Sequence, residues 1–308
     1  MIGAYFSKPD WHSPDYWWPY FPPKDRNVNY DPALHPDKWQ KFKDFTYNQI
    51  SELMTDYGKV DILWLDGGWV RPKSTIDTAV DWQRGIKFNQ DIDMPRIAAM
   101  GRAKQPGLIV VDRTVAGEFE NYTTPEQQVP GVPLDHPWET CITMGDSWSY
   151  VPNDHYKSAQ QIVQLLVKIV SRGGNLLLNI GPGPDGDWDP VAYSRLAQVS
   201  GWMETNGEGI YGSQSVAPYS SGDIYYTKAK NSNTIYAFLM AGKDSTVKFG
   251  STVTIKLNNI KAVKSVSLLG AKQRLKYKLK DDELIVSLPA AIQQNTGCQY
   301  AATFKITY

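Results

Sequence analysis

The chain has 308 residues, with 32 Lys and Arg against 32 Asp and Glu, so its formal net charge is zero. This length can bury a sizeable core as one large domain or two smaller ones. The balanced charge does not indicate a nucleic-acid or membrane-surface partner, and no apolar run of about 18 residues marks a membrane span. We therefore expect an uncharged ligand, no nucleic-acid partner and no membrane-spanning segment.

Aromatic residues are frequent, with 11 Trp and 18 Tyr. Several lie in Pro- and Gly-rich segments that we interpret as loops, residues 10–23 and 145–150. Rings in loops suit the faces of sugars, although the same rings could instead pack long loops onto the scaffold. The two cysteines, Cys141 and Cys298, lack metal-ligand spacing, so free thiols are expected and a disulfide stays open.

The first two-thirds of the chain alternate predicted strands and helices. Strands are predicted at 1–7, 59–65, 108–112, 139–145 and 175–181, and helices at 36–57, 91–105, 158–174 and about 190–206. Short, almost continuously apolar strands are typical of a parallel sheet covered on both faces. Long loops after the strands favour a (β/α) barrel with its site at the C-terminal strand ends, although five strands are fewer than the eight of a complete barrel.

The pattern changes from about residue 213 to short runs of alternating hydrophobicity separated by turn signals. The runs are 223–227, 234–240, 252–257, 264–269, 283–288 and 303–308. Such runs predict an antiparallel β-sandwich. The expected domains are therefore a (β/α) barrel portion over 1–212 and a C-terminal β-sandwich over 213–308, whose default role is to stabilise the first domain.

The segment ILWLDGGW, residues 62–69, ends an apolar run in a single carboxylate, Asp66. Because side chains alternate along a strand, Trp64 and Asp66 share one face while Leu63 and Leu65 share the other. At the C-terminal end of a barrel strand, Asp66 would lie in the site. The alternative is that Asp66 caps the turn made by the two glycines that follow it.

A second set of polar groups follows the next strand. Asp112 and Arg113 close that strand, and the loop after it carries Glu126. Two carboxylates among aromatic rings are what glycoside cleavage requires, since one attacks the anomeric carbon and the other protonates the leaving oxygen. A nearby Arg would keep a carboxylate ionised or bind sugar hydroxyls. With 32 acidic residues in the chain, however, spacing by itself does not decide the pair.

Seven segments resemble the α-L-fucosidases of glycoside hydrolase family 29: AYFSKPDWH, VDILWLDGGW, VVDR, NYTTPEQQVP, WETCITMGDSWSYVPND, GGNLLLNIGPGPDG and CQYAATFKI. They extend over the whole chain. The resemblance implies a (β/α)₈ TIM-like catalytic barrel followed by a β-sandwich. It also implies an exo-glycosidase that hydrolyses terminal α-L-fucose from oligosaccharides or glycoconjugates with retention of configuration. It implies no cofactor and no metal, and a periplasmic, secreted or lysosomal-type location.

The same resemblance assigns roles to individual residues. Asp66 matches the nucleophile that forms a covalent fucosyl-enzyme, and Glu126 matches the general acid/base, with Glu139 in reserve. The implied substrate-binding residues are Trp11, His12, Trp64, Arg113 and Trp148. Retention predicts that the two catalytic carboxyl groups lie about 5–5.5 Å apart.

The sequence departs from the family at its start. About three strand–helix units of the family, with a His-Trp-Gly motif and a His-His pair that grip fucose hydroxyls, have no counterpart here. The expected fold is therefore α/β, a partial (β/α)₈ barrel of about the last five units followed by the sandwich. Bare sheet edges predict self-association. The alternative function is a truncated, non-catalytic remnant that binds sugar weakly or not at all.

Overall fold

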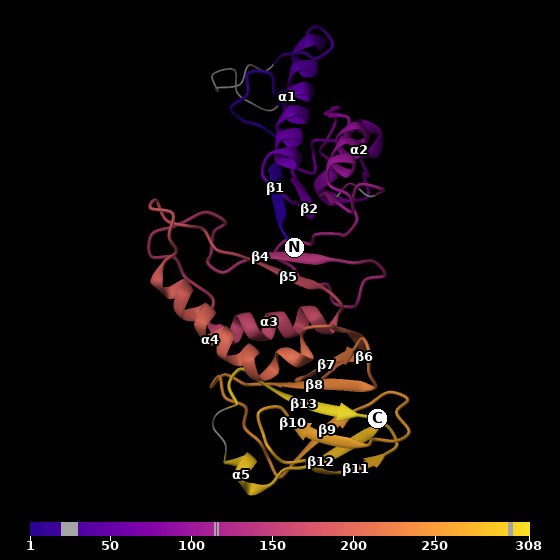
Figure 1. The fold of residues 1–308 in the computed structure, drawn as a ribbon, viewed down its shortest axis with the longest axis vertical. Coiled ribbons are helices and arrows are strands. Elements are labelled where there is room, and N and C mark those ends of the chain that lie inside the picture. Colours follow the sequence, from indigo (N-terminus) through magenta and orange to yellow (C-terminus); the bar gives the residue numbers. More distant parts are fainter. Residues whose placement is uncertain (20–29, 114, 116, 295–297) are drawn as a thin grey trace. The chain divides into compact units, whose positions relative to one another are not determined.

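The computed structural model describes residues 1–19, 30–113, 115, 117–294 and 298–308, and Figure 1 shows its elements. Residues 20–23 of the predicted aromatic loop therefore lie outside the described residues. Packing contacts group the chain into two compact units, Met1–Thr123 and Thr124–Tyr308. Within the described part of the chain, no helix has the length and apolar character needed to cross a membrane.

The first unit is a three-stranded parallel sheet with two helices. Its strands are β1 (Gly3–Ser7), β2 (Ile62–Asp66) and β3 (Ile109–Asp112), in the order β1-β2-β3. The connecting segments hold α1 (Pro36–Thr55), two 3₁₀ turns (Lys73–Thr75 and Asp81–Gln83) and α2 (Met94–Lys104). Leu63, Leu65 and Val110 pack against both helices in one core. These strands and helices confirm the predicted elements, with ends that differ by up to three residues.

The second unit begins with a parallel pair of strands, β4 (Glu139–Thr143) and β5 (Asn175–Asn179). α3 (Ala159–Ser171) connects them, and α4 (Pro190–Asn206) and a 3₁₀ turn (Gly207–Gly209) follow β5. α3 starts at a capping box. The Oγ of Ser158 accepts from the backbone N–H of Gln161 at 3.2 Å, and the Oε1 of Gln161 accepts from the backbone N–H of Ser158 at 2.8 Å.

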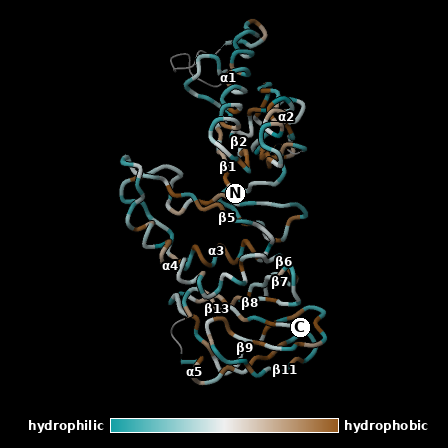
Figure 2. The backbone as a smooth tube through the Cα atoms, in the orientation of Figure 1, coloured by the Kyte–Doolittle hydropathy of each residue, from teal (hydrophilic) through white to brown (hydrophobic). Residues whose placement is uncertain are grey.

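α3 is buried on two sides. Ile169 packs with Trp138 and Ile142 beside β4. Val163 and Val167 pack instead with α4 and the C-terminal strands. Figure 2 shows the resulting hydrophobic colouring along α3. A helix between two layers needs apolar residues around more of its circumference than a surface helix does.

The rest of the second unit is an antiparallel β-sandwich, as predicted. One sheet has the order β10-β13-β8-β7-β6, with β6 (Ser213–Ser221), β7 (Ile224–Ala229), β8 (Thr234–Met240), β10 (Ser265–Leu268) and β13 (Ala301–Thr307). The other has the order β11-β12-β9, with β9 (Thr252–Lys256), β11 (Lys276–Lys280) and β12 (Glu283–Ser287), and α5 (Ala290–Gln293) follows. Ile235 and Phe304 of the first sheet share a core with Ile255 and Leu284 of the second.

Candidate active site

The face of the first sheet that points away from the helices carries polar and aromatic side chains. Strand register aligns Tyr5 with Trp64, and their rings stack with centroids 5.4 Å apart. Asp66 lies two residues further along the same face, at the C-terminal end of β2. Leu63 and Leu65 are completely buried on the opposite face, so the predicted alternation is confirmed.

Both carboxylate oxygens of Asp66 accept charge-stabilising hydrogen bonds. The hydroxyl of Tyr5 donates to Oδ2 at 2.7 Å, and the guanidinium of Arg113 donates to Oδ1 at 2.7 Å. Burial acts to raise the pKa of Asp66, but these two bonds and the backbone of Gly67 outweigh it. The pKa of Asp66 therefore lies below its ordinary value. Asp66 is a half-buried carboxylate held ionised at the end of a strand.

The guanidinium of Arg113 also lies over the ring of Trp64, beside the carboxylate of Asp66. The Arg113 guanidinium carbon lies 5.1 Å from the centroid of the Trp64 ring. A cation over the face of an aromatic ring is attracted by the electron density of that ring, so the contact holds the guanidinium beside Asp66. The Nε1 of Trp64 is buried and has no hydrogen-bond partner among the described residues. This donor is suited to a ligand oxygen, since leaving a buried N–H unpaired costs about 1–3 kcal/mol.

The loop after β1 crosses the end of β2 at Gly67. The backbone N–H of Lys8 donates to the carbonyl of Asp66 at 3.1 Å. Gly67 has a φ of +85°, and a Cβ there would overlap the ring of Pro9. Glycine is therefore required at this crossing, both for its backbone conformation and for its lack of a side chain.

The predicted binding residues Trp11 and His12 lie in this crossing loop. The ring of Trp11 is 43% exposed and lies 6.0 Å from that of Trp69, which follows the Gly67–Gly68 turn. His12 is exposed, and its backbone N–H donates to Asp10 Oδ1 at 2.9 Å. The first unit thus brings Trp11 close to the turn that follows Asp66.

A buried ion pair lies on the helix-facing side of the same strand ends. The ammonium of Lys8 donates to the carboxylate of Asp112, and both side chains are almost fully buried. Burial lowers the pKa of Lys8, and the attraction of Asp112 opposes that shift. Because Asp112 precedes Arg113, this pair ties the end of β1 to the strand end that supplies the guanidinium.

The two candidate acid/base residues lie around β4 in the second unit. Glu126 is exposed and forms a parallel bridge with Cys141, where the backbone N–H of Gln127 donates to the Cys141 carbonyl at 2.9 Å. Glu139 is the first residue of β4 and is half-buried. In parallel α/β folds the functional side chains gather at the C-terminal ends of strands. The bridge of Glu126 to Cys141 lies two residues further toward the C-terminal end of β4 than Glu139 does.

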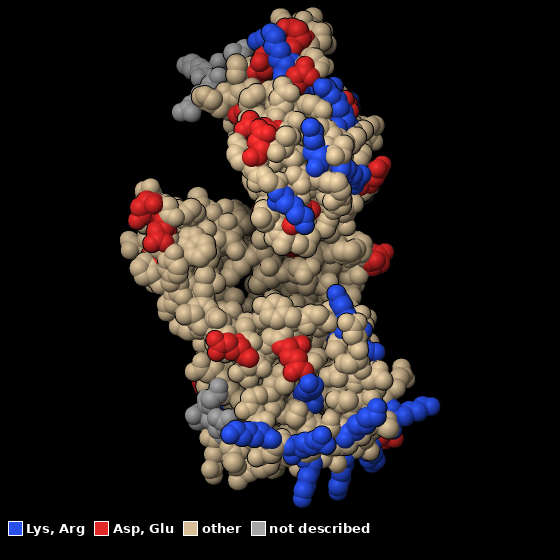
Figure 3. Space-filling view, viewed as in Figure 1, with Lys and Arg blue, Asp and Glu red and all other residues tan. Residues whose placement is uncertain are grey.

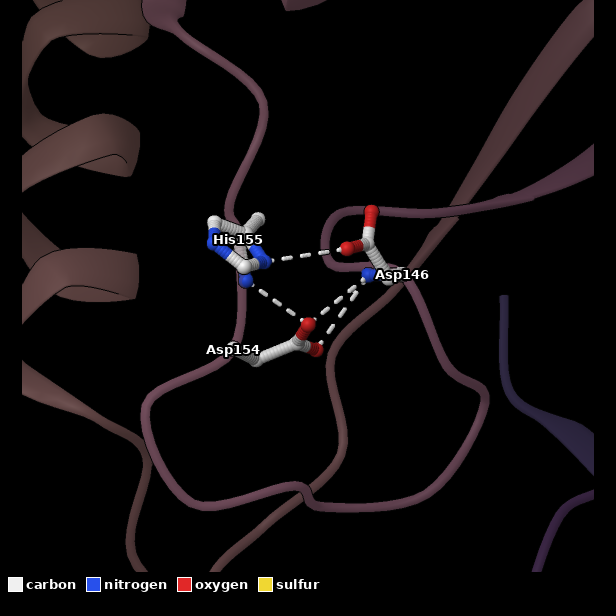
Figure 4. A group of neighbouring side chains, drawn as sticks. All are labelled: Asp146, Asp154 and His155. Atoms are coloured by element: carbon white, nitrogen blue, oxygen red, sulfur yellow. Dashed lines mark hydrogen bonds and ion pairs between the residues drawn. The ribbon is translucent and has the colours of Figure 1, made fainter.

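Trp148 lies in the loop after β4, and the carboxylate of Asp154 joins the two ends of this loop by accepting from the backbone of Asp146. Figure 4 shows the carboxylate of Asp154 next to the backbone of Asp146, and the backbone N–H of Asp146 donates to Asp154 Oδ1 at 3.1 Å. The Nδ1 of His155 lies 3.3 Å from Asp146 Oδ2. One carboxylate oxygen from each aspartate and one ring nitrogen of His155 lie within 4.8 Å of one another. The ring of Trp148 is 41% exposed, and its carbonyl accepts from Asn179 Nδ2 at 2.9 Å. These contacts fix the backbone of the loop and leave the ring open.

Comparisons with known proteins place the chain in a family. The α-L-fucosidase family profile matches residues 1–208, and that of the α-L-fucosidase C-terminal domain matches residues 218–307. The chain belongs to the α-L-fucosidase family. The proteins of this family to which it is similar are glycoside hydrolases. The predicted relationship is therefore confirmed.

Individual α-L-fucosidases agree with this placement. The chain is 32% identical over 279 residues to a plasma α-L-fucosidase of Pongo abelii, covering 85% of this chain and 55% of that protein. It is 26% identical to an α-L-fucosidase of Branchiostoma floridae, covering 99% of this chain and 63% of that protein. The chain thus spans about half to two-thirds of the length of these curated relatives.

A solved structure gives the same result for the fold. The chain superimposes on α-L-fucosidase isoenzyme 1 from Paenibacillus thiaminolyticus with a TM-score of 0.75 and 25% identity. The match covers 98% of this chain and 70% of that one. An α-L-fucosidase catalytic domain followed by a C-terminal antiparallel sheet domain is therefore the fold of this chain.

Two residues of the candidate site were missed by reading the sequence. The apolar run at 1–7 predicts a buried strand, whereas Tyr5 is 62% exposed and donates a hydrogen bond to Asp66. Lys8 was not singled out at all. Period-two alternation signals that Tyr5 shares a face with Gly3 and Ser7, but it does not reveal which residue of β2 lies opposite.

Proposed function

We propose that this chain belongs to a retaining exo-glycosidase that releases terminal α-L-fucose from fucosylated oligosaccharides or glycoconjugates. The observation that carries the proposal is Asp66, a strand-end carboxylate kept ionised by Tyr5 and Arg113 in a chain of the α-L-fucosidase family. A nucleophilic carboxylate must be ionised, open to substrate on one side and rigidly held. Asp66 is ionised, its side chain is 30% exposed and both of its oxygens are held.

The proposed chemistry has two steps. Asp66 attacks the anomeric carbon of fucose while Glu126 donates its proton to the leaving glycosidic oxygen, and the glycosidic bond breaks. Glu126 then takes a proton from water, whose oxygen attacks the same carbon and releases Asp66. Two displacements retain the anomeric configuration and place the carboxyl groups about 5–5.5 Å apart in the working enzyme.

The binding roles follow from ring and charge chemistry. Trp11, Trp64 and Trp148 offer faces for the apolar side of the sugar, and Trp64 Nε1 offers a donor. Arg113 and His12 offer charged or polar contacts to hydroxyls. We assign no cofactor and no metal to this reaction.

The finer architecture is also a proposal. We infer that β1 to β5, with α1 to α4, are five units of a (β/α)₈ TIM-like barrel over residues 1–212, and that residues 213–308 form the second domain. The support is that β1, β2 and β3 are parallel to one another, as are β4 and β5. β1 and β3 lie at the edges of the three-stranded sheet, and the backbone groups of an exposed edge can pair with another chain, so self-association through a sheet edge belongs to this proposal.

Release of 4-nitrophenol from 4-nitrophenyl α-L-fucoside tests the activity. The parent chain is expected to hydrolyse it, and Asp66→Asn to lose at least about a thousandfold in kcat. Asp81→Asn, at an exposed carboxylate of the 3₁₀ turn Asp81–Gln83, is the matched control and should match the parent. Equal rates for Asp66→Asn and the parent would remove Asp66 from the reaction. The β-D-galactoside and α-D-galactoside, run in parallel, test the choice of sugar.

Leaving-group dependence tests Glu126 against Glu139. 4-Nitrophenolate departs without protonation, whereas an alcohol needs the acid. Glu126→Gln should therefore slow a fucosyl disaccharide far more than the nitrophenyl fucoside, and Glu139→Gln should slow both alike. The reverse pattern would move the acid/base role to Glu139.

The alternative function is a non-catalytic remnant of a fucosidase, and experiments on the same protein can test it. Titration calorimetry with L-fucose, alongside the turnover assay, separates the two. Binding of fucose without turnover of any of the three glycosides would support the remnant. Turnover that Asp66→Asn abolishes would exclude it.

A further inference from the structure

The zero net charge of the chain conceals a strong imbalance between its two parts. Residues 213–308 contain 13 Lys and Arg but 5 Asp and Glu, whereas residues 1–212 contain 19 and 27. The C-terminal part therefore carries a net charge of about +8 and the preceding part about −8. Figure 3 shows Lys and Arg side chains gathered over the part of the sandwich where Figure 1 labels β11 and β12.

Four of these lysines lie on one face of the three-stranded sheet. Lys276, Lys278 and Lys280 of β11 are exposed and alternate with Tyr277 and Leu279, which pack on the sandwich core. Strand register aligns Lys280 with Glu283 of β12 and Glu283 with Lys256 of β9. We call this outer surface the lysine face, defined by Lys256, Lys276, Lys278 and Lys280. Alternate residues of a strand are about 6.6–6.8 Å apart, so β11 presents a regular row of cations.

The four lysines of the lysine face form no ion pair within the chain. In the part of the chain that the structure describes, no carboxylate lies within ion-pair distance of any of the four lysines. The register places Glu283 beside Lys256 and Lys280, and Asp281 and Asp282 form the turn that follows Lys280. A cluster of like charges raises the free energy of the free protein and attracts anions over several ångströms. A bound polyanion would relieve this repulsion.

The chemistry of the surface narrows the class of partner. Among the described residues of 213–308, no large apolar or aromatic side chain is exposed. Bases of single-stranded nucleic acids stack on exposed aromatic rings, and membrane-surface proteins insert apolar side chains. Twelve of the 13 cations are lysines, which act as point charges and not as the planar forks that read phosphate in two bonds. The surface is suited to dispersed anionic groups on a hydrated polymer.

We propose that the lysine face binds a sulfated polysaccharide and so holds the chain on anionic glycans. The choice of a glycan rests on the proposed function, since a fucosidase works among glycans. The choice of an anionic one rests on the four lysines and their lack of carboxylate partners. Edge-strand lysines also discourage sheet pairing between chains, and the test must separate that role from binding.

Binding of the full chain to a sulfated fucan and to the same fucan after desulfation tests the proposal. At low salt the sulfated polymer should bind at least about tenfold more tightly. The variant Lys276→Gln, Lys278→Gln, Lys280→Gln should lose about tenfold or more in affinity. Its slope of log Kd against log salt should fall by about 2, because each lost contact to a flexible polyanion removes about 0.7.

The control variant removes the same number of positive charges as the lysine-face variant, but from positions outside the lysine face. Lys104→Gln, Lys230→Gln, Lys243→Gln removes three exposed charges outside the lysine face, and it should keep most of the affinity. Neither triple variant should change hydrolysis of the nitrophenyl fucoside. Binding needs no turnover, so the result stands even if the chain proves inactive.

Three outcomes would overturn the proposal. Equal losses in the two triple variants would show an effect of net charge and no binding face. Tighter binding to duplex DNA or to phosphatidylserine vesicles than to the fucan would identify a different partner class. No binding to any probe, with the lysine-face variant aggregating more than the control, would show that these lysines only protect a sheet edge.

Discussion

At the scale of single residues, Tyr5 helps to lower the pKa of Asp66. Removal of its hydroxyl in Tyr5→Phe deletes a hydrogen bond that favours the ionised carboxylate, so the pKa of Asp66 should rise toward its ordinary value. The acid limb of the kcat/KM profile should then move to higher pH. At neutral pH the carboxylate of the variant stays ionised, because the ordinary pKa of an aspartate is about 4, so the loss of kcat/KM should be confined to the acid limb.

The matched control is Tyr57→Phe, because Tyr57 also donates to a carboxylate, that of Glu52, but at the exposed end of α1. Its pH profile should coincide with that of the parent. An acid limb that stays in place in Tyr5→Phe would show that Tyr5 does not set the ionisation of Asp66.

The ion pair of Lys8 and Asp112 should stabilise the first unit when both partners are present. Lys8→Met leaves a buried carboxylate unpaired and should lower the free energy of unfolding by about 3–5 kcal/mol. The double variant Lys8→Met, Asp112→Leu should regain most of that loss. Urea denaturation measures all three proteins. Lys41→Met, which breaks the exposed pair with Asp37, should change stability by less than about 1 kcal/mol. Additive losses in the double variant would contradict a coupled pair.

These residues also mark what sequence can predict at this scale. The shared face of Trp64 and Asp66 follows from alternation within one strand. The partners of Asp66 do not, because Tyr5 and Arg113 reach it only through the register of β1 and β3 against β2. Register depends on turns and packing that a single strand does not encode.

At the scale of elements, the sequence predicts the helices and strands with strongly periodic hydrophobicity but does not predict the strands β6 and β11. β11 has the sequence KYKLK, whose three lysines suggest an exposed loop. Its pairing with β12 makes it a strand and partly buries Tyr277 and Leu279 between the lysines. β6 contains Pro218, which argues against a strand. The sheet tolerates it because β6 is an edge strand whose register shifts between Ser215 and Ser220. Tertiary pairing overrides local preference in both strands.

The contact between Gly174, the residue before β5, and Trp138, the residue before β4, gives a prediction about packing. A Cβ at Gly174 would overlap the buried ring of Trp138, so Gly174→Ala should destabilise the second unit by about 1–3 kcal/mol. Gly201→Ala is the matched control. It lies inside α4 with open space around its Cα, and should stabilise by about 0.5–1 kcal/mol. Thermal denaturation of both variants checks the opposite signs, and a neutral Gly174→Ala would mean that the Trp138 ring moves aside easily.

At the scale of the whole molecule, the family and the order of its two domains could be predicted because their motifs are spread along the chain. The charge imbalance was hidden by a chain-wide sum, since the basic C-terminal part cancels the acidic remainder. Two copies of such a chain can attract each other through opposite charges. They can also pair through a sheet edge, and the two modes differ in their response to salt.

Self-association through the β1 edge should persist at high salt. In 1 M salt the Debye length is about 3 Å, which screens surface charges but leaves backbone hydrogen bonds and apolar contacts largely intact. Sedimentation velocity over a range of concentrations should therefore show the same oligomers in low and high salt. Ile2→Lys adds a charge at an exposed apolar position beside β1 and should weaken association, whereas Leu34→Lys, at another exposed apolar position, should not. Oligomers that dissociate in 1 M salt and ignore Ile2→Lys would assign the contact to the oppositely charged parts, and a monomer at every concentration would exclude both modes.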